Sequence, residues 1–197
     1  MTIEIFVLAA GSATRMGGAS KLSQPIGERT VIGRVIENLE VAGVDRMTVI
    51  YGDRWGLDDL ELPEHVHALH NENAEHGMGS SIALAVANLS PDTTRLLLAL
   101  GDMPQVRSET LSLLIQESRH SDANIWALTY QGRQGHPVVF ANCWFDELSK
   151  LDSDEGGAKL FRHERAKAAY IEVDDPGILI DIDTPADLSK MRADLKI

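Results

Sequence analysis

Hydrophobic and polar positions along the chain follow two patterns that alternate. One is a mostly apolar run of strand length, found at 3–9, 46–52, 66–70 (weaker), 95–102, 123–130, 137–145, 168–173 and 178–183. The other places apolar residues three and four positions apart, which is typical of one face of a helix. This helical pattern is found at 30–43, 80–89 and 109–120, and a last helix is expected to open with Thr184, Pro185 and Asp187. The acidic residue three positions after Thr184 makes a variant of the capping box.

The regular alternation of strand and helix predicts an α/β fold with a mostly parallel sheet in a three-layer αβα arrangement. A length of 197 residues suits one domain better than two, so we expect a single domain over 1–197. Ligands of such sheets bind at the carboxyl ends of the strands. The residues that follow each apolar run are therefore the candidates for function.

The start of the chain is open to two interpretations. The apolar run Ile5–Ala10 is followed by small residues, as in a secretory signal peptide and its cleavage site. A signal peptide also needs a basic segment before the apolar run, whereas Met1, Thr2, Ile3 and Glu4 include no basic side chain. The run is also short for a signal peptide, so we interpret it as the first strand.

Composition narrows the classes of function. The formal net charge of −12 argues against a nucleic-acid partner, which needs a basic face. No apolar stretch approaches the roughly 20 residues that span a bilayer, so no membrane partner is expected. The single cysteine, Cys143, cannot form an internal disulfide, which favours a reducing cytoplasm. We expect Cys143 to be a small buried hydrophobic residue.

A glycine-rich basic loop follows the first strand. Gly11, Gly17 and Gly18 allow close approach of the backbone, so that amides can point at an anion. Arg15 and Lys21 add two cations, suited to a polyphosphate. The loop matches neither the Walker A pattern nor the dinucleotide-binding pattern. From the residues alone, an ordinary loop with solvated charges stays an equal alternative.

A second glycine-containing loop, 71–81, leads into the predicted helix at 80–89. Its backbone amides and the hydroxyls of Ser80 and Ser81 could read a base or hold a phosphate. The alternative is a plain loop in which Ser80 or Ser81 caps the helix. His76 is expected to be a loop histidine, because no second histidine lies at metal-binding spacing.

Acidic residues stand at the ends of two predicted strands. Asp102 ends a fully apolar run, where an unpaired carboxylate is costly and a divalent metal is the usual partner beside phosphates. Asp181 and Asp183 repeat the arrangement, and residues two apart share a face of a strand. Both of these carboxylates, or only the terminal Asp183, could therefore point at one site, and carboxylates at two separate strand ends are what an oxygen-coordinated Mg²⁺ would need. A turn aspartate that bonds its own backbone is the alternative for Asp102.

Six motifs occur in the order typical of the MobA-like nucleotidyltransferases: L-A-A-G-S-A-T-R-M-G-G-A-S-K, G-M-G-S-S, L-G-D-M-P, G-H-P-V-V-F, D-E-G-G-A-K and D-I-D-T-P-A-D-L. The chain resembles this family along essentially its whole length, and within it the molybdenum cofactor cytidylyltransferases. The resemblance implies a Rossmann-like sheet of the nucleotide-diphospho-sugar-transferase kind. It also implies roles for individual residues: Leu8, Ala9, Ala10 and Gly11 against the nucleotide, Arg15 and Lys21 on its phosphates, Gly79, Ser80 and Ser81 at the base and ribose, Asp102 and Asp183 on Mg²⁺, and His136 and Lys159 facing the acceptor.

The reaction implied by the resemblance is transfer of CMP from CTP to molybdopterin, with release of pyrophosphate. Arg15, Lys21 and Asp102 would be catalytic, and no convincing nucleophile is needed, since positioning and charge neutralisation carry most of phosphoryl-type catalysis. A molybdoenzyme that receives the cofactor is the implied protein partner. Three alternatives stay open: a transferase that uses GTP, one with another phosphorylated acceptor, and a redox or non-catalytic cofactor-binding protein on the same scaffold.

Overall fold

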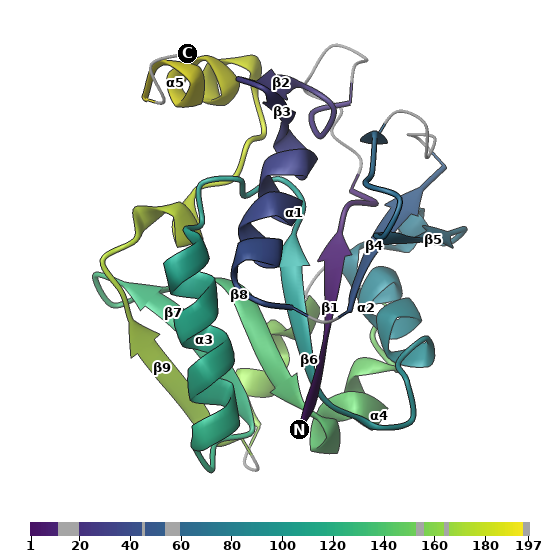
Figure 1. Cartoon of the computed structure of the whole chain (residues 1–197). Helices are drawn as coiled ribbons and strands as arrows, with labels where there is room; N and C mark the ends of the chain where they lie inside the picture. The colour runs from purple at the N-terminus through teal and green to yellow at the C-terminus, as the bar shows by residue number, and fades with distance from the viewer. Residues whose placement is uncertain (12–19, 45, 54–59, 153–155, 164–165, 195–197) are drawn as a thin grey trace.

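The protein is described by a computed structural model that covers residues 1–11, 20–44, 46–53, 60–152, 156–163 and 166–194. Its centre is a seven-stranded sheet in the order β5-β4-β1-β6-β8-β7-β9 (Figure 1). The strands are β1 (Thr2–Leu8), β4 (Met47–Gly52), β5 (His67–Asn71), β6 (Thr93–Leu100), β7 (Ile125–Tyr130), β8 (Arg133–Ala141) and β9 (Ala168–Glu172). A separate two-stranded ribbon pairs β2 (Pro25–Ile26) with β3 (Arg29–Thr30).

Strand direction in the sheet is mostly parallel, as the sequence predicts. β1 pairs in parallel with β4 and β6, β4 with β5, and β7 with β9. β8 runs antiparallel to both of its neighbours, β6 and β7, because a short turn joins it to β7. The carboxyl ends of the parallel strands and the start of β8 therefore meet at one edge of the sheet.

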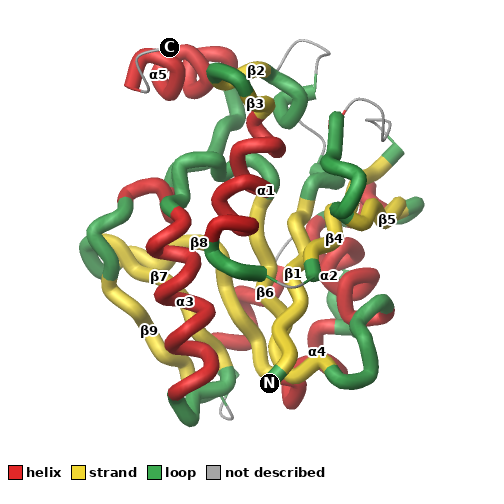
Figure 2. The backbone as a smooth tube through the Cα atoms, in the orientation of Figure 1, coloured by secondary structure: helices red, strands yellow, loops and turns green. Residues whose placement is uncertain are grey.

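Helices cover both faces of the sheet and make the three layers. In β1, Ile3, Ile5 and Val7 pack into one apolar cluster, and Phe6 packs into the other. The first cluster holds the buried faces of α1 (Val31–Val41), α3 (Ser108–His120) and α5 (Pro185–Asp194), and the second those of α2 (Met78–Ala87) and α4 (Phe145–Leu148). Figure 2 shows α1 and α3 in front of the strands and α2 behind them. The predicted three-layer α/β architecture is confirmed.

α1 begins where the sequence predicts. The hydroxyl of Thr30 accepts a hydrogen bond from the backbone N–H of Gly33 over 3.1 Å and caps the helix. The spacing of the apolar residues turns Val31, Ile32, Val35, Ile36 and Leu39 toward the sheet, and all five are buried.

The predicted strand at 178–183 is wrong. The segment begins as a short 3-10 helix, η6 (Pro176–Leu179), and continues without regular structure. The buried carboxylate of Asp175 fixes this turn, because it accepts hydrogen bonds from the backbone N–H of Gly177 (3.0 Å) and the hydroxyl of Thr110 (2.7 Å). Gly177 also lies so close to the loop after β6 that a Cβ atom there would stand 2.3 Å from the carbonyl oxygen of Gln105.

The predicted strand at 137–145 is placed too late. β8 starts at Arg133 and ends at Ala141, and a 3-10 helix, η4 (Asn142–Trp144), follows it. The turn buries Trp144 against the sheet and leaves Cys143 exposed, which corrects the expectation of a buried cysteine. Two other 3-10 helices are η3 (Ala74–His76) and η5 (Gly156–Arg162). Within the described ranges no helix is both long and apolar enough to cross a bilayer.

Candidate active site

A cleft of about 360 Å³ opens at the carboxyl-end edge of the sheet, between the end of β1 and the start of α2. Its lining residues are Leu8, Ala9, Ala10, Gly11, Lys21, Leu22, Ala74, Glu75, Gly77, Met78, Ser81, Leu100, Asp102 and Asp181. The structure therefore brings the end of β1, the loop before α2 and two of the three candidate aspartates to one cleft. Gly79 is buried in the first turn of α2 and Ser80 is half-buried beside it. Arg15 lies outside the described residues.

Close approach of two loops shapes one wall of this cleft. Gly52 ends β4, and a Cβ atom at this position would stand 2.8 Å from the Cβ of Ala74 and 3.4 Å from the carbonyl oxygen of Ala10. Such a short distance to Ala74 is a clash, so a side chain here would push the two loops apart. Glycine at position 52 thus lets Ala10 and Ala74 line the same wall.

The helix that borders the cleft starts earlier than predicted. α2 begins at Met78 and Gly77 occupies the capping position, so Ser80 and Ser81 are not N-caps. Their hydroxyls are held instead by Asn71, whose side-chain N–H groups donate to Ser80 Oγ (3.0 Å) and Ser81 Oγ (2.9 Å). Asn71 is buried at the end of β5 and was not singled out in the sequence, although a polar residue at a strand end is the signal that identified Asp102.

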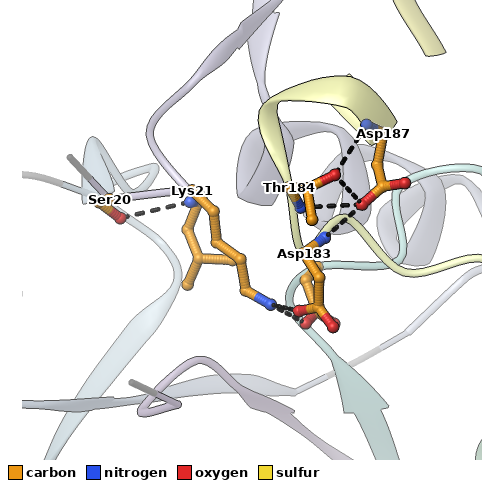
Figure 3. A network of polar contacts seen from close by, with 7 residues as sticks. Ser20, Lys21, Asp183, Thr184 and Asp187 are labelled. Carbon is orange, nitrogen blue, oxygen red and sulfur yellow. Dashed lines mark hydrogen bonds and ion pairs between the residues drawn. The ribbon is translucent and has the colours of Figure 1, made fainter. Parts of the chain in front are cut away.

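Lys21 joins two of the candidate metal ligands. Its ammonium lies 2.5 Å from Asp102 Oδ2 and 2.7 Å from Asp183 Oδ1 (Figure 3). Its side chain is only 10% exposed. Burial by itself would lower the pKa of Lys21, but the two carboxylates outweigh it and the net pKa is raised. Lys21 is therefore charged, and it contacts carboxylates at the position where the sequence predicts contact with phosphates.

Three carboxylates gather beside this lysine. Asp102, Asp181 and Asp183 each offer an oxygen atom, and these oxygens lie within 4.8 Å of one another. Asp102 Oδ1 is buried and has no hydrogen-bond partner among the described residues. Oxygen ligands of this kind suit hard divalent cations such as Mg²⁺ and Mn²⁺. Asp181 is exposed and belongs to this group, so Asp181 and Asp183 are both candidates for the second metal ligand.

The cap of α5 fixes the position of Asp183. The Asp187 carboxylate accepts hydrogen bonds from the backbone N–H of Asp183 (3.3 Å) and of Thr184 (2.8 Å), and from the Thr184 hydroxyl (2.7 Å). The backbone N–H of Asp187 donates in return to Thr184 Oγ1 over 3.2 Å. The hydrogen bonds from Thr184 lower the pKa of Asp187. The predicted acidic capping box is confirmed, and it anchors a candidate ligand as well as a helix.

The two residues expected at the acceptor lie in different places. His136 stands near the start of β8, and burial lowers its pKa, which the charges of Asp102 and Asp181 offset only in part. A neutral imidazole therefore lies beside the carboxylates. Lys159 is exposed on η5, which packs against α2 on the opposite face of the sheet from α1. Neither residue lines the cleft described above.

Comparison with known proteins agrees with the family resemblance of the sequence motifs. The sequence model of the family described as the MobA-like NTP transferase domain matches residues 5–169. The purine catabolism protein PucB of Bacillus subtilis is 27% identical over 195 residues, which cover 94% of this chain and 93% of PucB.

Solved structures extend the similarity over nearly the whole chain. Rv0371c of Mycobacterium tuberculosis has a TM-score of 0.87 and 29% identity, with 98% of each chain covered. A complex of Rv0371c with manganese has a TM-score of 0.82 and 27% identity, over 98% of this chain and 99% of that one. CMP:2-keto-3-deoxy-manno-octonic acid synthetase in complex with CTP has a TM-score of 0.78 at 16% identity, over 100% and 99% of the two chains. This last similarity concerns the fold alone and agrees with the expected nucleotide-diphospho-sugar-transferase kind.

Proposed function

Because the chain belongs to the MobA-like NTP transferase family, we propose that it transfers CMP from CTP to the terminal phosphate of molybdopterin and releases pyrophosphate. One observation carries the proposal: a charged lysine and three carboxylates lie together at one edge of a cleft that ends on the first turn of a helix. The cleft volume of about 360 Å³ is in the range of small-molecule sites. The choice of molybdopterin rests on the resemblance of the motifs.

The nucleotide would lie along the cleft between the end of β1 and α2. Ala10 and Gly11 would border it on one side, and the backbone N–H groups of the first turn of α2 would face it on the other. Such groups bind anions and polar base edges readily. Ser80 and Ser81, held by Asn71, would contribute hydroxyls on the base and ribose side.

The proposed reaction forms one bond and breaks one. An oxygen of the acceptor phosphate attacks the α-phosphorus of CTP, and the bond from this phosphorus to the bridging oxygen breaks. The electron pair leaves with pyrophosphate, whose charge Lys21 and Arg15 would neutralise. The acceptor phosphate is already anionic, so no protein base has to remove a proton. A divalent cation held by Asp102 and Asp183, Mg²⁺ by our proposal, would supply neutralisation of the charge that develops on the phosphates.

The acceptor would approach from the β8 side of the carboxylates. His136 lies there, outside the lining of the cleft, as a neutral imidazole that could donate a hydrogen bond to a phosphate oxygen without adding a charge. Asp181 is exposed at the same edge. Lys159 belongs to this proposal only through its motif, since it stands apart from the cleft.

The test is pyrophosphate release by the purified chain with Mg²⁺, with CTP or GTP, and with molybdopterin, a sugar phosphate or no acceptor. We expect release with CTP and molybdopterin together, and a product that carries CMP. Faster turnover of GTP would reject the nucleotide choice, and turnover only with the sugar phosphate would reject the acceptor. No release under any condition, from folded protein that binds CTP, would favour a non-catalytic cofactor-binding protein. Asp102→Asn is the inactive control.

A further inference from the structure

Among the described residues, the positive charge at the carboxylates is the side-chain amino group of Lys21. Lys21 Nζ contacts Asp102 Oδ2 and Asp183 Oδ1, one oxygen from each of the two residues that we propose as metal ligands. The Lys21 side chain comes from the segment that follows the glycine-rich loop, and it meets Asp183 from the segment before α5 (Figure 3). Asp102 comes from the residues just after β6. Three distant parts of the chain therefore meet at a single ammonium group.

We infer that Lys21 competes with the divalent cation for this carboxylate pair, and that the nucleotide relieves the competition by drawing the ammonium onto its phosphates. Metal would then be loaded together with the nucleotide and not before it. The competition itself follows from the contacts of Lys21, whereas the order of loading rests on the proposed function.

The distances make joint occupancy unfavourable. The Lys21 nitrogen stands 2.5 and 2.7 Å from the two oxygens. Mg²⁺ binds carboxylate oxygens at about 2.0–2.1 Å. A divalent cation on the same two oxygens would therefore lie within about 4 Å of the ammonium, where like charges repel strongly. Burial of Lys21 limits the screening of this repulsion by solvent.

The nucleotide offers Lys21 an alternative partner in the same cleft. Lys21 lines this cleft together with the end of β1, where the triphosphate is proposed to lie. Phosphate oxygens can replace the carboxylates as partners of the ammonium, so the chain need not leave a buried charge unpaired. By linkage, a nucleotide that tightens metal binding must itself be bound more tightly when metal is present.

The direct test measures Mn²⁺ affinity without nucleotide, by the electron paramagnetic resonance signal of free Mn²⁺. We expect Lys21→Met to bind Mn²⁺ about tenfold more tightly than the wild type, because a repelling charge is removed. Lys21→Arg keeps the charge and should stay near the wild type. Lys150→Met is the matched control, since Lys150 also pairs with an aspartate, Asp146, but on α4. Unchanged or weaker Mn²⁺ binding by folded Lys21→Met would overturn the competition.

A second measurement keeps the test independent of the folding of that variant. In the wild type, saturating Mn²⁺ should expose the Lys21 amine and increase its acetylation by acetic anhydride, quantified by mass spectrometry, while Lys150 serves as the internal reference. Equal or lower modification of Lys21 with Mn²⁺ would contradict the inference.

The order of loading is tested by repeating the Mn²⁺ titrations with a non-hydrolysable CTP analogue. The analogue should tighten Mn²⁺ binding more in the wild type than in Lys21→Met, because only the wild type has a competing ammonium to remove. An equal gain in both proteins would overturn the order of loading while the competition stands. Failure of the analogue to bind would reject the proposed nucleotide and, with it, the order of loading. The Mn²⁺ affinities measured without nucleotide would be unaffected.

Discussion

The side-chain amide of Asn71, the last residue of β5, donates a hydrogen bond of 2.9 Å to the hydroxyl of Ser81 in the first turn of α2. The other end of the same amide is also used, because Asn71 Oδ1 accepts from the backbone N–H of Asn73 over 3.0 Å. A single buried side chain thus fixes both the loop after β5 and the start of the helix. The wall of the cleft that is proposed to hold the base depends on it.

Replacement of Asn71 by Ala should loosen this wall. Ser81 is buried and would lose a partner, so we expect a loss of about 1–3 kcal/mol in the free energy of unfolding. KM for the nucleotide should rise more than kcat falls, since the reacting groups are elsewhere. Urea unfolding and steady-state kinetics measure both effects. Asn88→Ala is the control, because the side chain of exposed Asn88 donates to the carbonyl of Leu84 at the far end of α2. An equal loss there would argue against the assigned role.

Asp102→Asn should remove most of the activity and preserve the fold. The variant keeps the shape of the side chain but loses the charge that faces Lys21 and the proposed metal. Loss of one preorganised electrostatic contact costs about 3 kcal/mol, roughly a hundredfold in kcat/KM. Turnover at the wild-type rate by a folded variant would contradict the assignment. Asp92→Asn serves as a control, because Asp92 is an exposed aspartate at the opposite edge of the sheet.

Asp187→Ala tests whether the α5 cap positions Asp183. Loss of a capping side chain costs about 1 kcal/mol of stability. We also expect weaker Mn²⁺ binding, although Asp187 is not itself a proposed ligand, because the backbone of Asp183 loses its anchor. Calorimetric titration with Mn²⁺ measures this. Metal affinity that stays at the wild-type value despite lower stability would show that the cap does not position Asp183 for metal binding. Asp194→Ala, in the last turn of α5, is the control for the lost negative charge.

The fold should lose stability in acid as Glu4 becomes protonated. Burial raises the pKa of Glu4, but hydrogen bonds from Thr93 and Ser90 and the charge of Arg46 outweigh it, and the net pKa falls below its ordinary 4.5. A lowered folded-state pKa means that Glu4 stabilises the fold above about pH 4.5, and that this contribution is lost as the pH drops through the folded-state pKa. The stability gap between the wild type and Glu4→Gln should therefore shrink below pH 4.5. Urea unfolding at several pH values checks this, and a gap that does not change with pH would refute it.

Ala10→Gly should relax the choice of nucleotide. The methyl group of Ala10 borders the cleft near Gly52 and Ala74, and it takes space that a purine would need. One methyl-sized change in a pocket is worth about 1–3 kcal/mol, so the preference for CTP over GTP should weaken without inverting. Competitive turnover of both nucleotides decides it, with Ala87→Gly, at an exposed position of α2, as the control for added flexibility. A wild-type preference for GTP would reject the cytidylyltransferase assignment.

Local patterns in the sequence predicted the parts of the fold that local forces determine. β1 was predictable because its apolar run is uninterrupted and of strand length, and α1 because its buried positions repeat with the period of a helix. The Thr184–Asp187 cap was predictable because both partners lie within one turn. The segment 178–183 was mispredicted because the turn that leads into it depends on contacts of Asp175 with Thr110 and of Gly177 with Gln105, which are far away in sequence. Apolar content alone cannot distinguish such a segment from a strand.

The sequence predicted which residues belong to the candidate site better than it predicted the contacts between them. Strand-end position identified Asp102, and the glycine-rich loop identified Lys21. Whether a lysine contacts phosphate or carboxylate depends on distances between strands that no local pattern contains. Asn71 was overlooked for a related reason, since its importance comes from the two hydroxyls that α2 brings to it.

The reversed direction of β8 places the proposed acceptor side and the proposed nucleotide side of the site on different elements. Since β8 runs against its neighbours, its first residues, with His136, and the turn that joins it to β7 stand at the same edge as Asp102. The proposed acceptor side is thus built on a hairpin, whereas the proposed nucleotide side is built on loops between β1, β4, β5 and α2. We expect insertions or substitutions in the 131–132 turn to affect the proposed acceptor side and to leave the proposed nucleotide side intact. A relative could acquire a new acceptor by local change, with the donor half inherited whole.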